Sequence, residues 1–177
     1  MSTVDFDAVN TTITLDMVRE AFTAAMQERG EAWTYPKRPQ DNVRYTGCRY
    51  RWTQDDVDGG TIDDPALVGK PACAVGEVFA RLDLLDALVP KDDEQEDGRD
   101  AYQNNMAAFR DFIHFALVDG KSRAVLAIPQ ADGIPVATIT VGARYYLAVL
   151  QDQQDAGACW ADADAFAYDS VIGGYTH

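Results

Sequence analysis

The sequence has few of the side chains that hydrolases use as a nucleophile and a base. Its 177 residues include only three serines and two histidines, which are Ser2, Ser122, Ser170, His114 and His177. No serine lies in the G-x-S-x-G motif of the α/β-hydrolases. His114 lies in the apolar run "FIHFAL", where a structural role is the favoured interpretation. We therefore expect no catalytic residue of this type, and the composition leans toward a protein that is not an enzyme.

Cysteine is also sparse. Cys48, Cys73 and Cys159 are odd in number and far apart, which argues against a disulfide framework. The C-x₂-C pairs typical of zinc sites are absent. The sequence also has neither a P-loop nor a G-x-G-x-x-G loop that could hold a phosphate group. We expect no metal ion, no cofactor, and reduced thiols in a cytoplasmic protein.

Long apolar runs are missing as well. None approaches the ~20 residues that a membrane-spanning helix needs. The first residues, "MSTVDFD", lack the basic and apolar segments of a secretory signal. The sequence therefore predicts a cytoplasmic location and no membrane partner.

Positive charge is in short supply, because 15 Lys and Arg residues face 29 Asp and Glu residues for a net charge of −14. Such a field repels phosphate backbones and anionic lipids, so nucleic acid is an unfavoured partner. The expected partner is a host or regulatory protein, with a basic surface as one option, and a homo-oligomer stays open. Solubility alone is the competing explanation for the charge.

The acidic residues concentrate in two segments, 53–70 and 90–100, which we predict to be loops. The second contains "KDDEQEDGRD", for which a solvated linker is the leading interpretation and a contact surface the alternative. The candidate partner-binding residues on these two loops are Asp55, Asp56, Asp58, Asp63, Asp64, Asp92, Asp93, Glu94, Glu96 and Asp97.

A basic strip interleaved with aromatic residues interrupts the acidic background. Its candidate binding residues are Arg44, Arg49, Tyr50, Arg51 and Trp52. Such strips can stack on and grip single-stranded nucleic acid. The favoured alternative is that Tyr50 and Trp52 pack inward while the arginines pair with the acidic loops of the same chain.

The periodicity predicts an α+β fold, a mainly helical single domain over 13–177 after a loose lead-in over 1–12. About five helices are expected, beginning at Thr14, Pro71, Asp100, Thr140 and Trp160. A strand is expected over 48–52, with one buried and one wet face, and a hairpin over 122–141, giving a small antiparallel sheet. Gly76 lies inside the second helix, which indicates close packing against a neighbour.

Two phrases stand out in the sequence. One is Cys73-Ala74-Val75-Gly76 at the start of a helix, and the other is "LQDQQDAGACWADA" over 150–163. Together they resemble a group of small uncharacterised cytosolic proteins of actinobacteria and actinobacteriophages, which combine a C-x-V-G helix with a Q-D-x-G-x-x-W-x-x-A element. The resemblance implies an accessory or host-takeover protein and carries no activity. Physically, the second phrase predicts a helix, a glycine stop, and Trp160 folding back onto the core.

The leading hypothesis is an acidic, non-enzymatic binding protein, such as a phage-encoded inhibitor or modulator of a host protein. One alternative is a DNA mimic whose carboxylates block a DNA-binding protein. The other is a Mg²⁺-dependent hydrolase or nuclease, because paired carboxylates can hold Mg²⁺. Its candidate ligands are Asp55, Asp58 and Asp63, or Asp162 and Asp164.

Overall fold

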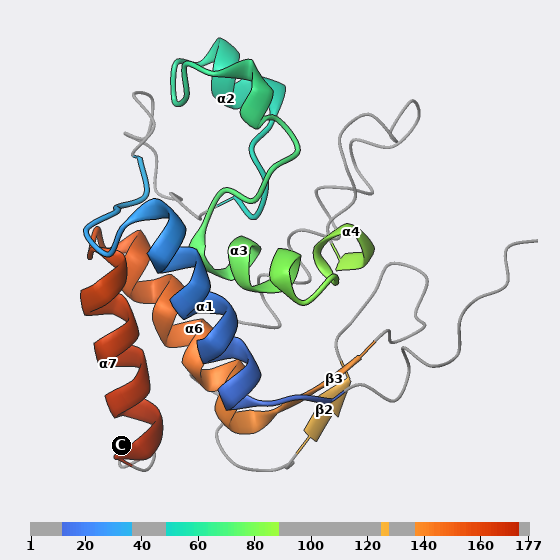
Figure 1. Ribbon diagram of the computed structural model, residues 1–177, viewed down its shortest axis with the longest axis vertical. Coiled ribbons are helices and arrows are strands. Elements are labelled where there is room, and N and C mark those ends of the chain that lie inside the picture. The colour runs from blue at the N-terminus through green and yellow to red at the C-terminus, as the bar shows by residue number, and fades with distance from the viewer. Residues whose placement is uncertain (1–11, 37–48, 89–124, 128–136, 174–177) are drawn as a thin grey trace, which may run out of the picture.

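The computed structural model describes residues 12–36, 49–88, 125–127 and 137–173, and these are mostly helical (Figure 1). The longer helices are α1 (Leu15–Arg29), α3 (Ala74–Arg81), α6 (Val141–Asp155) and α7 (Trp160–Ile172). The shorter ones are α2 (Gln54–Asp58), α4 (Leu85–Leu88) and the 3₁₀ turn η2 (Pro65–Leu67). The helix expected from Asp100, the acidic segment 90–100 and Arg44 lie outside the described residues.

Local capping signals set the ends of the long helices. The Thr14 hydroxyl accepts a hydrogen bond from the amide of Met17, and the Gly30 amide donates to the carbonyl of Met26 at 2.8 Å, so α1 has the predicted bounds. Thr140 caps α6 in the same way by accepting from Ala143. The helix predicted from Trp160 is confirmed and runs to Ile172.

The start of α3 differs from the prediction. Pro71 does not open the helix, because its backbone belongs to an isolated β-bridge with Arg51. The N-cap is Cys73 instead, whose thiol accepts from the amide of Gly76. The two residues after Pro71 are therefore used to leave the bridge before the helix begins at Ala74.

The sheet corrects the predicted fold class. Its strand order is β1 (Thr12–Ile13), β3 (Thr138–Thr140), β2 (Val125–Ala127). The two runs expected as a hairpin do pair antiparallel, but β1 pairs with β3 in parallel, so the small antiparallel sheet predicted from the sequence is wrong. Since β1 leads directly into α1 and β3 directly into α6, and these helices pack together, the two strands run the same way (Figure 1).

The expected strand over 48–52 is also wrong within the described residues. Apart from the single bridge at Arg51, residues 49–52 form no ladder. The buried face predicted for Tyr50 and Trp52 is confirmed, but the wet face is only partly present, because Arg49 is half-buried and Arg51 is buried. The alternation of apolar and basic residues misled the prediction, since the buried guanidinium of Arg51 finds partners inside the protein.

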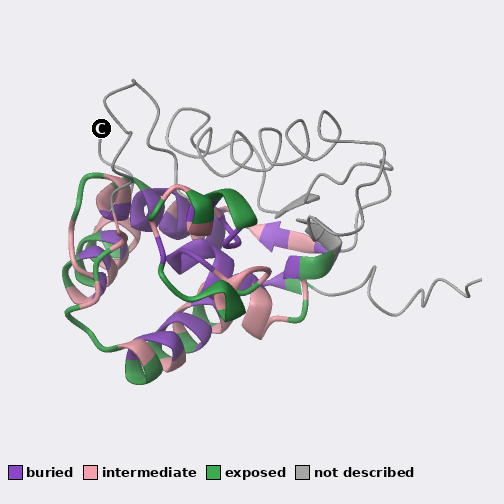
Figure 2. Ribbon diagram, turned by 90° about the horizontal axis from the view of Figure 1, so that it is seen from above, coloured by how far each residue is buried: buried purple, intermediate pink, exposed green. Residues whose placement is uncertain are grey.

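The core lies between α1, α3, α6 and α7 (Figure 2). Helices α1 and α7 are buried on one side, whereas residues 74–79 of α3 and 146–151 of α6 are buried all round. Its largest fully buried side chains include Trp160, Tyr50, Tyr146, Phe22 and Phe79. The burial of Trp160 confirms that the chain folds back onto the core after α6. A helix with one buried and one exposed side is stabilised mainly by that packing rather than by its intrinsic propensity.

Gly76 marks the tightest described approach in this core. A Cβ atom built on Gly76 would lie 2.2 Å from the carbonyl oxygen of Tyr50 and 3.0 Å from its carbonyl carbon. The same oxygen accepts the amide of Ala72 at 3.0 Å, so the backbone of Tyr50 has little freedom to retreat. The close packing predicted at Gly76 is therefore confirmed, and its neighbour is Tyr50.

We expect Gly76→Ala to lower the free energy of unfolding by about 2 kcal/mol, because overpacking against backbone outweighs the gain in helix propensity. The matched control is Gly142→Ala in α6, where a Cβ would meet only Val171 at 3.8 Å. That variant should be neutral or slightly stabilising. Urea denaturation of both variants checks the prediction, and equal midpoints would contradict it.

Candidate functional site

Residues 51–71, here called the acidic lobe, leave the helical body and return to it at one point (Figure 1). The base is closed by backbone hydrogen bonds from Trp52 to the carbonyl of Lys70 at 3.0 Å and from Gly69 to the carbonyl of Trp52 at 2.8 Å. Arg51 reinforces it by donating to the carbonyl of Gly69 at 2.7 Å and pairing with Asp86 of α4. The predicted loop 53–70 is therefore a closed unit containing α2 and η2.

The acidic lobe has a small apolar cluster of its own. Trp52, Ile62 and Ala72 are buried together, and Val57 and Leu67 pack against them. The ring of Tyr35 stacks on Trp52 with centroids 5.5 Å apart and an interplanar angle of 12°. Burial of these apolar side chains stabilises the fold of the lobe, in addition to the hydrogen bonds at its base.

Asp56 has a structural role inside the lobe. It is fully buried, and its carboxylate accepts hydrogen bonds from the amide and hydroxyl of Thr53 in a capping box at the start of α2. Arg49 lies 3.8 Å from the same carboxylate and donates to the Thr53 hydroxyl. A partner therefore cannot reach Asp56 in this conformation, although the sequence made it a candidate contact.

The other described acidic candidates are exposed. Asp55, Asp58, Asp63 and Asp64 all lie on α2 or the turn after it. Asp58 accepts from the side-chain amide of Gln54, and Asp64 caps η2 by accepting from Ala66. The structure thus brings these four residues onto one lobe, whereas Asp92, Asp93, Glu94, Glu96 and Asp97 lie outside the described residues.

The aromatic side chains of the basic strip are not available for stacking on a base in its described part. Tyr50 and Trp52 are buried, as the inward-packing alternative expected. Tyr50 donates its hydroxyl to Gln151 on α6 at 3.1 Å, and Arg49 and Arg51 pair with aspartates of the same chain. These side chains attach the acidic lobe to the helical body.

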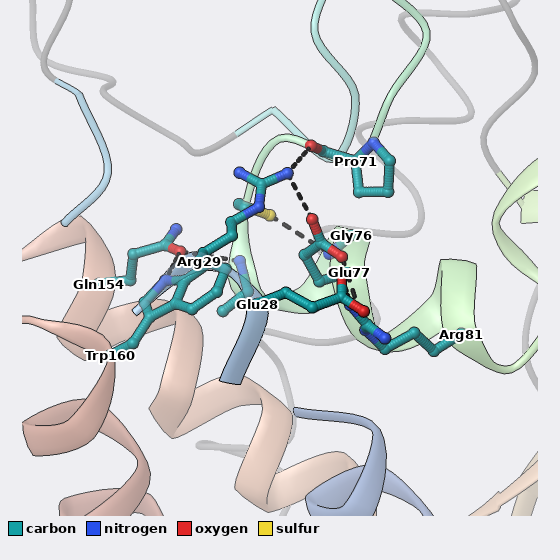
Figure 3. A network of polar contacts seen from close by, with 10 residues as sticks. Glu28, Arg29, Pro71, Gly76, Glu77, Arg81, Gln154 and Trp160 are labelled. Atoms are coloured by element: carbon teal, nitrogen blue, oxygen red, sulfur yellow. Dashed lines mark hydrogen bonds and ion pairs between the residues drawn. The ribbon is translucent and has the colours of Figure 1, made fainter. Parts of the chain in front are cut away.

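A second polar network lies where α1 meets α3 (Figure 3). Arg29 donates to the carbonyl of Pro71 at 2.7 Å and pairs with Glu77, and Arg81 pairs with Glu28 at 2.7 Å. The hydrogen bond from Arg81 lowers the pKa of Glu28 from its ordinary value. This network holds the end of the acidic lobe against α1, and no periodic pattern in the sequence indicates it.

Gln154 joins the two phrases on which the family resemblance rests. Its side-chain oxygen accepts the amide of Ala74 at 2.8 Å and the indole N–H of Trp160 at 3.2 Å, and only 2% of the residue is exposed (Figure 3). Trp160 packs in turn against Phe22 and Trp33, with centroids 5.2 and 4.4 Å away. The two phrases therefore form one structural clasp between α3, α6 and α7.

The aspartates on α7 diverge rather than converge. Asp164 turns toward the body, accepting from Tyr146 on α6 and pairing with Arg19 on α1 at 3.4 Å, whereas Asp162 is exposed. Burial and the hydrogen bond to Asp164 raise the pKa of Tyr146 well above its ordinary value. Within the part of the chain that is described, no group of three or more His, Cys, Asp or Glu residues could hold a metal ion.

Comparisons with known proteins found no match for this chain. No protein-family model matched it, and searches of the curated proteins and of the solved structures found no similar protein. The resemblance to actinobacterial and phage proteins therefore stays a prediction. None of the described helices is both long and apolar enough to span a membrane.

Gln154→Ala should lower the free energy of unfolding by about 2 kcal/mol, because it leaves two buried N–H donors without an acceptor. The neighbouring Gln153→Ala is the control, since Gln153 is half-buried and the two side-chain hydrogen bonds of the clasp are made by Gln154. Chemical denaturation followed by tryptophan fluorescence reports both. Equal losses in the two variants would show that the clasp has no special role.

Stability should also fall with alkali. The raised pKa of Tyr146 means that the unfolded chain loses this proton above about pH 10 while the folded chain keeps it, so folding is favoured below that pH and the advantage fades above it. Between pH 10 and 11.5, Tyr146→Phe should flatten the fall in unfolding free energy by up to about 1.4 kcal/mol per pH unit. The unfolding free energy is measured by chemical denaturation at each pH. If it falls with pH at the same rate in Tyr146→Phe and in the unaltered protein, the assignment to Tyr146 is refuted.

Proposed function

We propose that the protein is an acidic accessory protein that binds another protein through the exposed aspartates of the acidic lobe. The partner is a host or regulatory protein with a basic contact surface, in the cytoplasm. The proposal rests on the observation that the aspartates of the lobe differ in burial and in role. Asp56 is buried and holds the local fold, while Asp55, Asp58 and Asp63 are exposed on the same short segment.

The ordering of the lobe supports this proposal over simple solvation. A solvated linker needs no apolar cluster, yet the lobe has one around Trp52 and Ile62. It also has a base closed by Arg51 and a clamp through Arg29 and the carbonyl of Pro71. Carboxylates held on such a platform lose less conformational entropy on binding than carboxylates on a free chain.

The charge of the chain supports a basic protein as the partner. A net charge of −14 accelerates encounter with a positive surface and slows encounter with nucleic acid. The free thiols Cys73 and Cys159 are consistent with a reducing compartment. Within the described residues, the exposed aspartates of the lobe lie on one short helix and the turn beside it, and this is shorter than the carboxylate array that a DNA mimic would require.

Neutralising the exposed acids tests the proposal. The variant Asp55→Asn, Asp58→Asn, Asp63→Asn should weaken capture of the natural partner from a lysate of producing cells by about tenfold or more, and the capture by the unaltered protein should fall with added salt. Asp64 is left unchanged because it caps η2.

The matched control is Glu20→Gln, Glu31→Gln, Asp152→Asn, which removes the same three charges from exposed sites on the helical body. This control variant should still capture the partner. Equal loss of capture in both triple variants would show that only the net charge matters. Unchanged capture in both variants would contradict a role for the lobe.

A further inference from the structure

The outer face of α7 combines exposed apolar and acidic side chains. Among the described residues, the two exposed large hydrophobic side chains, Phe166 at 55% and Ile172 at 61%, both lie on this helix. Asp162, Ala165 and Asp169 are exposed beside them. Because Asp169 is three residues from both Phe166 and Ile172, these side chains share one side of the helix.

The opposite side of α7 fixes the orientation of this face. Trp160, Ala163 and Ala167 are buried, and α7 packs along α6 (Figure 1). Asp164 ties the helix to Tyr146 and Arg19. The exposed face is therefore presented by a helix that the core holds in place, which keeps the entropic cost of docking low.

We propose that this outer face of α7, formed by Asp162, Ala165, Phe166, Asp169 and Ile172, docks a basic amphipathic helix of a partner protein. The partner's apolar stripe would cover Phe166 and Ile172, and its Lys or Arg residues would pair with Asp162 and Asp169. The acids are seven residues apart, about 10.5 Å along the helix, so the partner's cations should recur at a heptad spacing. This site is separate from the acidic lobe and does not depend on it.

The negative charge of this face of α7 determines which kind of partner it can bind. A second copy of this chain would place Asp162 and Asp169 opposite acids of the same kind, which disfavours a symmetric contact. An anionic lipid surface is repelled by the same two carboxylates. Neither acid has a described ion-pair partner within the chain, so both are available to cations. A basic amphipathic helix satisfies the apolar and the acidic side chains together.

The test uses the ¹⁵N-labelled full chain and a synthetic amphipathic Lys/Leu helix as the probe. We expect amide shifts centred on 162–172, and at least about tenfold weaker binding by Phe166→Ser, Ile172→Ser. A scrambled Lys/Leu peptide of the same composition should bind at least about tenfold more weakly than the amphipathic one. The lobe variant Asp55→Asn, Asp58→Asn, Asp63→Asn should bind the amphipathic peptide as the unaltered protein does.

A charge reversal guards against loss of fold in the serine variant. Asp162→Lys, Asp169→Lys should switch the preference from the Lys/Leu peptide to a Glu/Leu peptide. The proposal is overturned by absent shifts, by equal binding of the scrambled peptide, or by association of the chain with itself through Phe166. Shifts centred on the acidic lobe and lost in the lobe variant would also overturn it, while supporting the function proposed for the lobe.

Discussion

The contact between the backbone of Tyr50 and Gly76 is the constraint on which the rest of the described structure depends. At this contact the backbone carbonyl of Tyr50, which directly precedes the acidic lobe, lies so close to α3 that there is no room for a Cβ atom at position 76. The hydroxyl of the same residue donates to Gln151 on α6, so Tyr50 contacts α3 through its backbone and α6 through its side chain. A side chain at position 76 would push the backbone of Tyr50 away from α3.

Around this contact, buried polar groups hold the structure together at points where apolar packing alone would not define an orientation. Gln154 joins α3 to α7 through two N–H donors, and Arg29 joins α1 to the end of the acidic lobe. Such groups are costly to bury unless they are paired, so they favour one arrangement over its competitors. The described structure has two acidic features on its exterior, the lobe and the outer face of α7.

Sequence reasoning succeeded where the signal is local. The helix starts at Thr14 and Thr140 were predictable because the apolar periodicity that begins there and the hydroxyl cap at Thr14 act within one turn. It failed where the partner is distant. The pair Thr12–Ile13 is too short to show an alternation, and its parallel partner lies on the far side of the sequence. The face of Arg51 was also unpredictable, because its burial depends on Gly69 and Asp86.

The acidic lobe is an ordered platform rather than a solvated connection. Amide hydrogen exchange of Trp52 and Gly69 tests this, because both amides donate to backbone carbonyls at the base of the lobe. We expect these two amides to exchange far more slowly than those of an unstructured chain, with protection approaching that of α1 and α6. Exchange of both amides at the rate of a free peptide would contradict it.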